Sequence, residues 1–288
     1  MNLGIFDSGL GGLTVLRSIN EHLPEISTTY FGDNANAPYG TKSFEEIFSH
    51  TLAGVRFLFS RGCPLVILAC NTASAQALRK IQQEILPVEF PDRRIIGIIR
   101  PTVEYLVEET EVKRIGVFAT DATVRSEAYV HEFEKILPLA NREISIFQKS
   151  CPGLVEAVEA GLPPPSPSLG FGGAGLTPPP GWEGESGAEL LIKKYCQSFD
   201  GDVALLGCTH YPFLKSLFEK YLPGVLVLSQ GEVVAEKLAD YLKRHSEIDS
   251  QLDKTGQREF FTSGDPVEVA KSAKVFDGSE VEWNRMVV

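Results

Sequence analysis

The sequence predicts an α/β fold with mostly parallel sheets, and three observations support this prediction. Short apolar segments recur along the chain and end in turn residues, as buried strands of a parallel sheet do. Segments with helical spacing of apolar residues lie between them, which is typical of right-handed β-α-β connections. Polar motifs follow several of the predicted strands, at the sheet edge where open α/β folds bind ligands.

Five segments are predicted to be strands and five to be helices. The strands read LGIF, PLVILA, RIIGII, IGVFA and VALL, at residues 3–6, 64–69, 94–99, 115–119 and 203–206. The helices lie at residues 10–22, 44–61, 73–86, 123–137 and 232–244, where apolar side chains recur every three or four positions. The chain of 288 residues is long enough for about two domains, at roughly 150 residues per domain.

Composition excludes several classes of protein. The net charge of −11 argues against binding to nucleic acid or to an anionic membrane, because a phosphate backbone requires a basic face. A small anionic substrate remains possible, since a local site can oppose the overall field. The first residues do not resemble a signal peptide, and no apolar run approaches the ~18 residues of a membrane span. We therefore expect a cytoplasmic protein with no nucleic-acid or membrane partner.

The cysteines also favour a cytoplasmic protein. There are five, an odd number at low density, and none forms a C-x-x-C pair. A disulfide framework and a structural zinc site are therefore not expected, and no other spacing of His, Cys and carboxylate residues suggests a metal. Reduced thiols are the expected state.

One segment departs from the α/β pattern. Residues 161–187 are rich in Pro and Gly and cannot continue a helix or a central strand. We expect a long surface loop there. It could act as a lid or bind a partner, but a neutral insertion is the favoured interpretation, because surface loops tolerate added length well.

Two similar motifs stand out, V-I-L-A-C-N-T at 66–72 and V-A-L-L-G-C-T-H at 203–210. Each places a cysteine, Cys70 or Cys208, at the end of an apolar strand with a helix expected to follow. A helix N-terminus favours the thiolate, and two facing cysteines can act as a proton-abstracting base and a proton-donating acid. His210 is placed to tune Cys208. Cysteines are often only small buried hydrophobes, and we interpret the remaining three in that way.

Two other motifs are less specific when read alone. D-S-G-L-G-G at 7–12 offers Asp7, Ser8 as a helix cap, and glycines that permit a close backbone approach. It matches neither common phosphate-binding glycine pattern. Y-F-G-D-N-A-N-A-P-Y-G at 30–40 contains Tyr39 and Gly40, whose backbone N–H groups can face a carboxylate, although the segment alone predicts only a turn.

Taken together, the motifs resemble those of glutamate racemases. The matching segments keep the order and spacing of that family: GIFDSGLGGLTVL at 4–16, YFGDNANAPYGTKS at 30–43, ACNTASA at 69–75, ATDATVRS at 119–126, LGCTHYP at 206–212 and FFTSGDP at 260–266. The resemblance covers nearly the whole chain outside the 161–187 segment. In the triplet Leu228-Ser229-Gln230 this sequence departs from the D-S-G-like triplet that is common in the family.

The resemblance implies a cofactor-independent racemase that interconverts L- and D-glutamate and supplies D-glutamate for peptidoglycan. It implies two pseudo-symmetric Rossmann-like domains with mostly parallel sheets and the active site in the cleft between them. We place the first domain at residues 1–95 plus 212–288 and the second at 96–211, with the insertion inside it. No cofactor and no metal are expected, the partner is the small-molecule substrate, and we expect a homodimer.

The resemblance also assigns roles to individual residues. Cys70 and Cys208 match the two catalytic bases, which act on the D- and the L-enantiomer respectively. The other residues implied in catalysis are Asp7, His210 and Glu159, the last of which partners the histidine. The residues implied in substrate binding are Asp7, Ser8, Tyr39, Gly40, Asn71, Thr72, Thr209 and His210.

Three alternatives remain open at this point. A racemase of aspartate or of another acidic amino acid would use the same motifs. A non-catalytic binding protein, acting through the 161–187 loop, would bind without turnover. A cysteine hydrolase with Cys208 as nucleophile and His210 as base is also conceivable, but it leaves Cys70 without a role.

Overall fold

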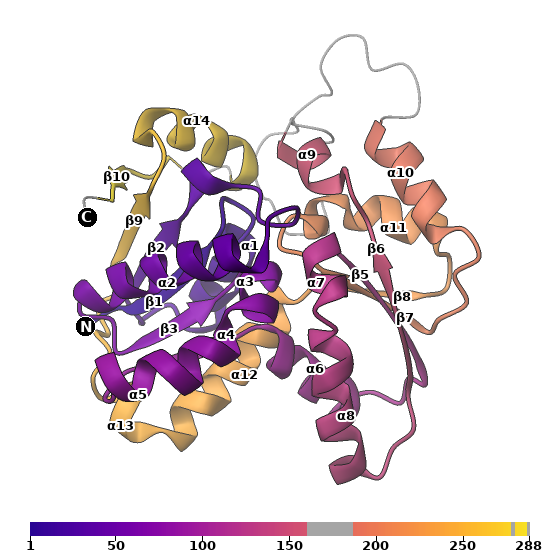
Figure 1. Ribbon diagram of the computed structural model, residues 1–288, viewed down its shortest axis with the longest axis horizontal. Helices are drawn as coiled ribbons and strands as arrows, with labels where there is room; N and C mark the ends of the chain where they lie inside the picture. The colour runs from indigo at the N-terminus through magenta and orange to yellow at the C-terminus, as the bar shows by residue number, and fades with distance from the viewer. Residues whose placement is uncertain (160–186, 278–279, 287–288) are drawn as a thin grey trace.

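The computed structural model shows two lobes, each built on its own parallel sheet with helices around it (Figure 1). The structure describes residues 1–159, 187–277 and 280–286, so the predicted loop at 161–187 lies almost wholly outside the described residues. We call the lobe with the six-stranded sheet the first lobe, and the lobe with the four-stranded sheet the second lobe. The two-sheet α/β prediction is confirmed.

The strands of both sheets run parallel to their neighbours. The first sheet has the order β10 (Trp283–Arg285), β9 (Arg258–Thr262), β2 (Thr28–Gly32), β1 (Leu3–Asp7), β3 (Leu65–Leu68), β4 (Arg94–Gly97). The second sheet has the order β6 (Ser145–Ser150), β5 (Arg114–Ala119), β7 (Val203–Gly207), β8 (Leu226–Leu228).

Helices cover both sheets and connect their strands. The α-helices are α1 (Leu13–His22), α2 (Phe44–Ser60), α3 (Asn71–Gln76), α4 (Leu78–Lys80), α5 (Leu86–Glu89), α6 (Ile99–Glu108), α7 (Asp121–Arg125), α8 (Ala128–Ala140), α9 (Leu154–Glu159), α10 (Gly187–Cys196), α11 (Lys215–Tyr221), α12 (Gly231–Arg244), α13 (Ser246–Asp249) and α14 (Pro266–Asp277). The described residues also form three short elements: the 3₁₀ helices η1 (Asn34–Asn36) and η4 (Tyr211–Leu214) and the π-helical η2 (Ile81–Ile85).

All five predicted strands are present, and the helical segments are found where the apolar spacing placed them. Two of those helices are interrupted, and the one predicted at 73–86 is divided among α3, α4, η2 and the start of α5. The predicted helix at 123–137 is divided between α7 and α8, because Glu127 adopts a left-handed conformation with φ of 52° between them. The predicted strand at 94–99 ends at Gly97, since α6 begins at Ile99 with Pro101 in its first turn.

The cores lie on both faces of each sheet, as in a doubly wound fold. In β1, Ile5 packs into the cluster that contains α1 and α12, whereas the next residue, Phe6, packs into the cluster that contains α2. In β7, Leu205 and Leu206 divide in the same way. This alternation requires strands that are apolar on both faces, which is the pattern the sequence shows.

The chain passes between the lobes twice. It leaves the first sheet after β4 and enters the second lobe through α6. It leaves the second sheet after β8 and returns to the first lobe through α12. Helix α12 packs against α1 and α6. The domain limits 1–95 plus 212–288 and 96–211 stay a prediction. The chain returns to the first lobe after Leu228, later than the predicted residue 212. The reason is that β8 pairs with β7 and therefore belongs to the second sheet.

No helix in the described part of the chain is long and apolar enough to span a membrane.

Candidate active site

The strand ends bring the polar motifs of each lobe together. In the first sheet, Phe6 pairs with Leu68, so Asp7 and Cys70 follow at the same carboxyl edge. In the second sheet, Ala119 pairs with Gly207, and Cys208 follows directly. Each lobe thus presents one cysteine at the end of an inner strand, β3 or β7.

Glycines allow the loops of the two lobes to touch. A Cβ atom on Gly11 would stand 2.5 Å from Thr209 Oγ1 and 2.6 Å from His210 Nδ1. A Cβ on Gly12 would stand 2.5 Å from the Cβ of Asp7. The loop at 7–12 therefore lies directly against the cysteine loop of the second lobe, and any larger residue would push the two apart.

Asp7 connects the two lobes at this point. Its side chain is fully buried, and it accepts hydrogen bonds from the backbone N–H of Gly9 at 3.0 Å and from Thr209 Oγ1 at 3.4 Å. Burial raises the pKa of Asp7, while the charge of nearby His210 and the hydrogen bonds it accepts oppose this rise. Asp7, Thr209 and His210 thus form one cluster, as the sequence motifs predicted.

Cys70 caps α3 from within a buried polar pocket. Its Sγ accepts a hydrogen bond from the backbone N–H of Ala73 at 3.4 Å and lies 3.4 Å from Ser8 Oγ. Burial nevertheless raises the pKa of Cys70 to about 12, and the charge of Asp7 adds to the rise. The expectation that a helix N-terminus lowers this pKa is wrong, because desolvation of the thiolate outweighs one backbone donor.

Cys208 has different surroundings. A short turn follows it, and the expected helix begins at Tyr211 as the 3₁₀ helix η4 and continues as α11. Its Sγ lies 4.0 Å from His210 Nδ1, and His210 Nε2 lies 3.1 Å from Glu159 Oε1. Burial lowers the pKa of His210, but the interactions with Cys208 and Glu159 prevail and raise it to about 10. Glu159, at the end of α9, thus stands beside the histidine.

The hydroxyls of both lobes meet beside Cys70. Thr72 Oγ1 lies 2.9 Å from Thr120 Oγ1, which lies 3.0 Å from Thr123 Oγ1. The sequence reasoning did not name Thr120 or Thr123 as site residues, although the strand-end motif ATDAT contains both. A threonine directly after a buried strand was the available signal.

The loop at 37–40 also reaches the second lobe. A Cβ on Gly40 would stand 3.0 Å from the Cβ of Thr120, and the Gly40 carbonyl accepts a hydrogen bond from the Ala122 N–H at 3.2 Å. The Tyr39 hydroxyl, in contrast, donates to Asp33 Oδ2 at 2.5 Å. Its side chain is therefore engaged with Asp33, which the sequence reasoning had not named, and burial raises the pKa of Tyr39 well above its usual value.

Asn71 is bonded to two side chains outside the predicted set. Its Nδ2 donates to Gln230 Oε1 at 2.8 Å, and its Oδ1 accepts from the Tyr129 hydroxyl at 2.6 Å. Gln230 belongs to the triplet that departs from the family pattern, although the sequence analysis assigned it no role.

The other three cysteines stand apart from this cluster. Cys63, Cys151 and Cys196 are buried, and burial raises the pKa of each thiol, to about 11 for Cys63 and about 12 for Cys196. Buried thiols that remain protonated fit the role of small apolar side chains.

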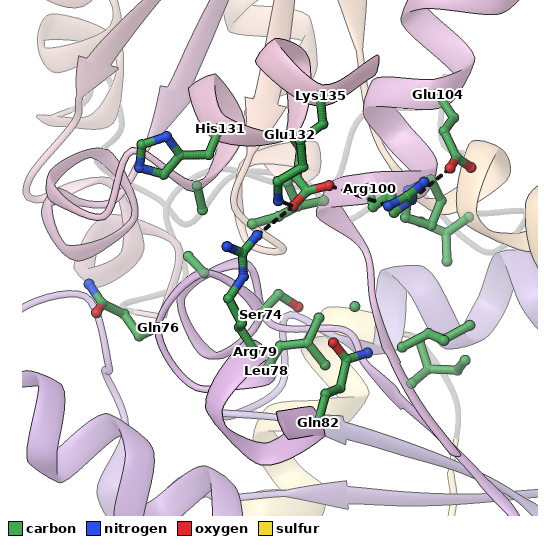
Figure 2. Close-up of a pocket in the computed structure, with 18 of the residues that line it drawn as sticks. Ser74, Gln76, Leu78, Arg79, Gln82, Arg100, Glu104, His131, Glu132 and Lys135 are labelled. Atoms are coloured by element: carbon green, nitrogen blue, oxygen red, sulfur yellow. Dashed lines mark hydrogen bonds and ion pairs between the residues drawn. The ribbon is translucent and has the colours of Figure 1, made fainter. Parts of the chain in front are cut away.

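A pocket of about 1080 Å³ lies elsewhere between the lobes (Figure 2). It is lined by Ser74–Gln76 of α3 and by residues of α6, α8 and α12, and neither Cys70 nor Cys208 lines it. Arg79 and Arg100 approach Glu132 there, at 3.3 Å and 3.9 Å. Because neither thiol lines this pocket, we do not assign it to the chemistry of the thiols.

The strand-end cluster holds groups that can donate and accept protons. Cys70 is a thiol whose raised pKa keeps it protonated and able to donate. Cys208 lies beside a histidine that is protonated at neutral pH. A protonated imidazole stabilises a neighbouring thiolate, which is the form that accepts a proton.

Comparison with known proteins gives a consistent result. No protein-family model matches the chain. A glutamate racemase from Ruegeria pomeroyi is 39% identical over 292 residues, covering 96% of each chain. The crystal structure of a glutamate racemase isoform from Bacillus anthracis has a TM-score of 0.81 at 28% identity, covering 100% of this chain and 97% of that one. A glutamate racemase from Francisella tularensis, crystallised with D-glutamate, has a TM-score of 0.78 at 28% identity with the same coverage.

Proposed function

The chain belongs to the glutamate racemase family, and we propose that it interconverts L- and D-glutamate by a two-base reaction at Cys70 and Cys208. The observation that supports this mechanism is the paired placement of the two thiols. Each follows an inner strand of its own sheet, and the loops around them are in contact through Gly11, Thr209 and Asp7. A substrate held between the lobes would then have one thiol on each side.

In the direction from L- to D-glutamate, the Cys208 thiolate removes the proton from the α-carbon. The Cys70 thiol gives its proton to the opposite face of the resulting carbanion. The product is D-glutamate, and the enzyme is left with a neutral Cys208 and a Cys70 thiolate. The reverse reaction, or proton exchange with water, restores the first state, so protons balance over the cycle.

The surroundings of each thiol fit this assignment of roles. The pKa of Cys70 is raised to about 12, which suits a proton donor, whereas His210 next to Cys208 carries a positive charge up to a pH of about 10. Burial of the site strengthens the interaction between the imidazolium and a thiolate, because the local dielectric constant is lower than in water.

Hydroxyl and backbone N–H groups are proposed to hold the charged groups of glutamate. Ser8, Thr72 and Thr209 surround the thiols, and the backbone at Tyr39 and Gly40 is close to Thr120 of the second lobe. Such donors, fixed before the substrate binds, stabilise charge that develops on a substrate carboxylate as the α-carbon loses its proton.

We further propose that the reaction takes place in the cytoplasm and supplies D-glutamate for peptidoglycan synthesis. The homodimer remains a prediction, which light scattering of the purified protein at several concentrations would test. An aspartate racemase remains the second candidate, because the two-thiol arrangement does not depend on side-chain length. A chiral-product assay over a panel of acidic amino acids separates the two.

The central test is racemisation of glutamate without added cofactor, in D₂O. The wild-type protein should form the opposite enantiomer with deuterium at the α-carbon. C70S and C208S should each lose racemisation almost completely, by about 10³-fold, within the range typical of a removed acid–base group. C63S serves as the matched control, since Cys63 is a buried thiol away from the cluster. Full activity in C70S or C208S would rule out the two-thiol mechanism.

A further inference from the structure

Gln230 has an unusual position for a residue with no assigned role. It directly precedes α12 and is only 3% exposed, so its carboxamide must find partners inside the protein. Its Nε2 donates to Thr102 Oγ1 at 2.9 Å, to the Tyr129 hydroxyl at 2.9 Å and, more weakly, to the Ile98 carbonyl at 3.4 Å. Its Oε1 accepts from Asn71 Nδ2.

These contacts join the two places where the chain passes between the lobes. Ile98 lies between β4 and α6, on the outward crossing, and Gln230 lies between β8 and α12, on the return crossing. The hydrogen bonds from Gln230 to Ile98 and to Thr102 of α6 therefore bridge the two connections. Any change in the angle between the lobes acts on this residue.

Asn71, Gln230 and Tyr129 form a closed ring of hydrogen bonds. Asn71 donates to Gln230 at 2.8 Å, Gln230 donates to the Tyr129 hydroxyl at 2.9 Å, and that hydroxyl donates to Asn71 Oδ1 at 2.6 Å. Each side chain gives one hydrogen bond to a neighbour and takes one from the other, so the ring fixes the orientation of both amides. All three side chains are buried.

One member of the ring, Asn71, is next to a proposed catalytic thiol. Asn71 follows Cys70 in sequence and begins α3, whose first turn Cys70 caps through Ala73 N–H. An amide NH₂ has two hydrogens, so Asn71 keeps one N–H beyond its bond to Gln230. Because Asn71 is the first residue of the helix that Cys70 caps, we expect a change in its restraint to affect the Cys70 turn.

We propose that Gln230 is a positioning residue for the racemisation: it fixes Asn71, and through it the Cys70 turn, against both connections between the lobes. This inference rests on the proposed function, because it assigns Gln230 an effect on the thiol that the reaction uses. Glutamine fits the position because it both donates and accepts. An ionised glutamate cannot donate, and methionine lacks the amide altogether.

Two variants test this role. Q230M keeps the length of the side chain and removes the amide, and Y129F removes one oxygen from the same ring. We expect kcat for racemisation to fall by about tenfold to a hundredfold in Q230M, as is typical when a reacting group is misaligned, with a smaller fall in Y129F and a smaller change in KM. Q82M is the matched control, since Gln82 Nε2 donates to the Ile95 carbonyl inside the first lobe.

A combination of variants separates positioning from general stability. If Gln230 and Tyr129 both act through Asn71, the loss of kcat in the Q230M/Y129F double variant is smaller than the two single losses combined. The effect of Q82M on kcat, in contrast, combines independently with that of Q230M or Y129F. Thermal melts confirm that each variant is folded at the assay temperature. A kcat in Q230M equal to that of Q82M, or strictly additive losses, would overturn the inference.

A second measurement does not depend on turnover. Alkylation of Cys70 by iodoacetamide, followed by peptide mass spectrometry in the C208S background, should be faster in Q230M and Y129F than in Q82M, because the Cys70 turn is less restrained. If the wild-type protein fails to racemise glutamate but this difference appears, the proposed function fails and the positioning role stands. Equal alkylation rates in all three variants would refute the positioning role.

Discussion

Cys70 and Cys208 occupy equivalent positions in the two lobes but are surrounded by different chemistry. Both follow an inner parallel strand, β3 or β7, and both are buried. Cys70 is held by a hydroxyl and a backbone N–H and stays protonated up to a pH of about 12. Cys208 is held by His210, whose own pKa is raised to about 10. The comparison teaches that two cysteines at equivalent strand ends can have different electrostatic surroundings, because different residues follow each strand.

The largest effect is expected when one thiol is removed and the reaction of each enantiomer is followed separately. This experiment tests whether Cys70 and Cys208 have different roles. In D₂O, C70S should still exchange the α-hydrogen of L-glutamate through Cys208, and C208S should still exchange that of D-glutamate through Cys70. Racemisation falls by about 10³-fold in both, because one side of the α-carbon has lost its proton donor or acceptor. The measurement is deuterium incorporation into each enantiomer, resolved by chiral chromatography and mass spectrometry. Exchange of both enantiomers at equal rates in C70S would contradict the division of roles.

The second prediction concerns His210, the residue beside Cys208. E159Q removes the carboxylate that helps to raise the pKa of His210, so this pKa should fall below about 10. At a pH between the lowered pKa and about 10, less of His210 is then protonated, so the positive charge beside Cys208 is present less often. Above the lowered pKa of His210, we expect the kcat that starts from L-glutamate to fall by up to about tenfold per unit of pKa lost, with little change at neutral pH.

Two measurements check this prediction. An NMR titration of the His210 imidazole gives the pKa directly, and kcat as a function of pH in both directions gives the effect on catalysis. The values of kcat/KM must fall equally in both directions, because the enantiomers have the same free energy, so only kcat can reveal asymmetry. E247Q is the control, since Glu247 pairs with the exposed His245 at 3.2 Å. An unchanged His210 titration in E159Q would show that Glu159 does not set this pKa.

The smallest expected effect concerns the Cys70 side. The charge of Asp7 contributes to the raised pKa of Cys70, second to burial. D7N removes that charge, so the pKa of Cys70 should fall from about 12 toward its ordinary value, and more thiolate should be present at a given alkaline pH. In the C208S background, iodoacetamide should then modify Cys70 faster, by at most about tenfold per pKa unit. The rate at Cys63 provides the internal control. Slower modification of Cys70 in D7N would contradict the prediction that Asp7 raises the pKa of Cys70.

Much of the fold was predictable because it depends on local patterns. Apolar strands such as VALL and VILA, with helical spacing between them, determine the strand and helix order. Five of the ten described strands were not predicted: β2, β6, β8, β9 and β10. The segments TTYFG (β2), SIFQKS (β6) and REFFT (β9) mix polar with apolar residues and do not form an apolar run, and β8 and β10 have only three residues each. Short or half-buried strands of this kind form when a neighbouring strand is already in place.

Part of the candidate site was predictable for a related reason. Polar residues at a strand end must lie at one edge of a parallel sheet, so topology places Asp7 and Cys70 at the carboxyl edge of the first sheet and Cys208 at the carboxyl edge of the second. The pKa of Cys70 was not predictable in this way. The sequence shows a thiol before a helix, which favours the thiolate, but the degree of burial and the distance to Asp7 decide the direction of the shift.

The sequence by itself determined the two-sheet α/β architecture, the two cysteines and the family resemblance, since each depends on residue types and spacing along the chain. Only the tertiary structure decided how distant residues act on one another. Gln230 meets Asn71 across 159 positions of sequence, and no motif predicted that contact. Desolvation and hydrogen bonding act through space over a few ångströms, and packing of the two lobes, which no local pattern encodes, sets those distances.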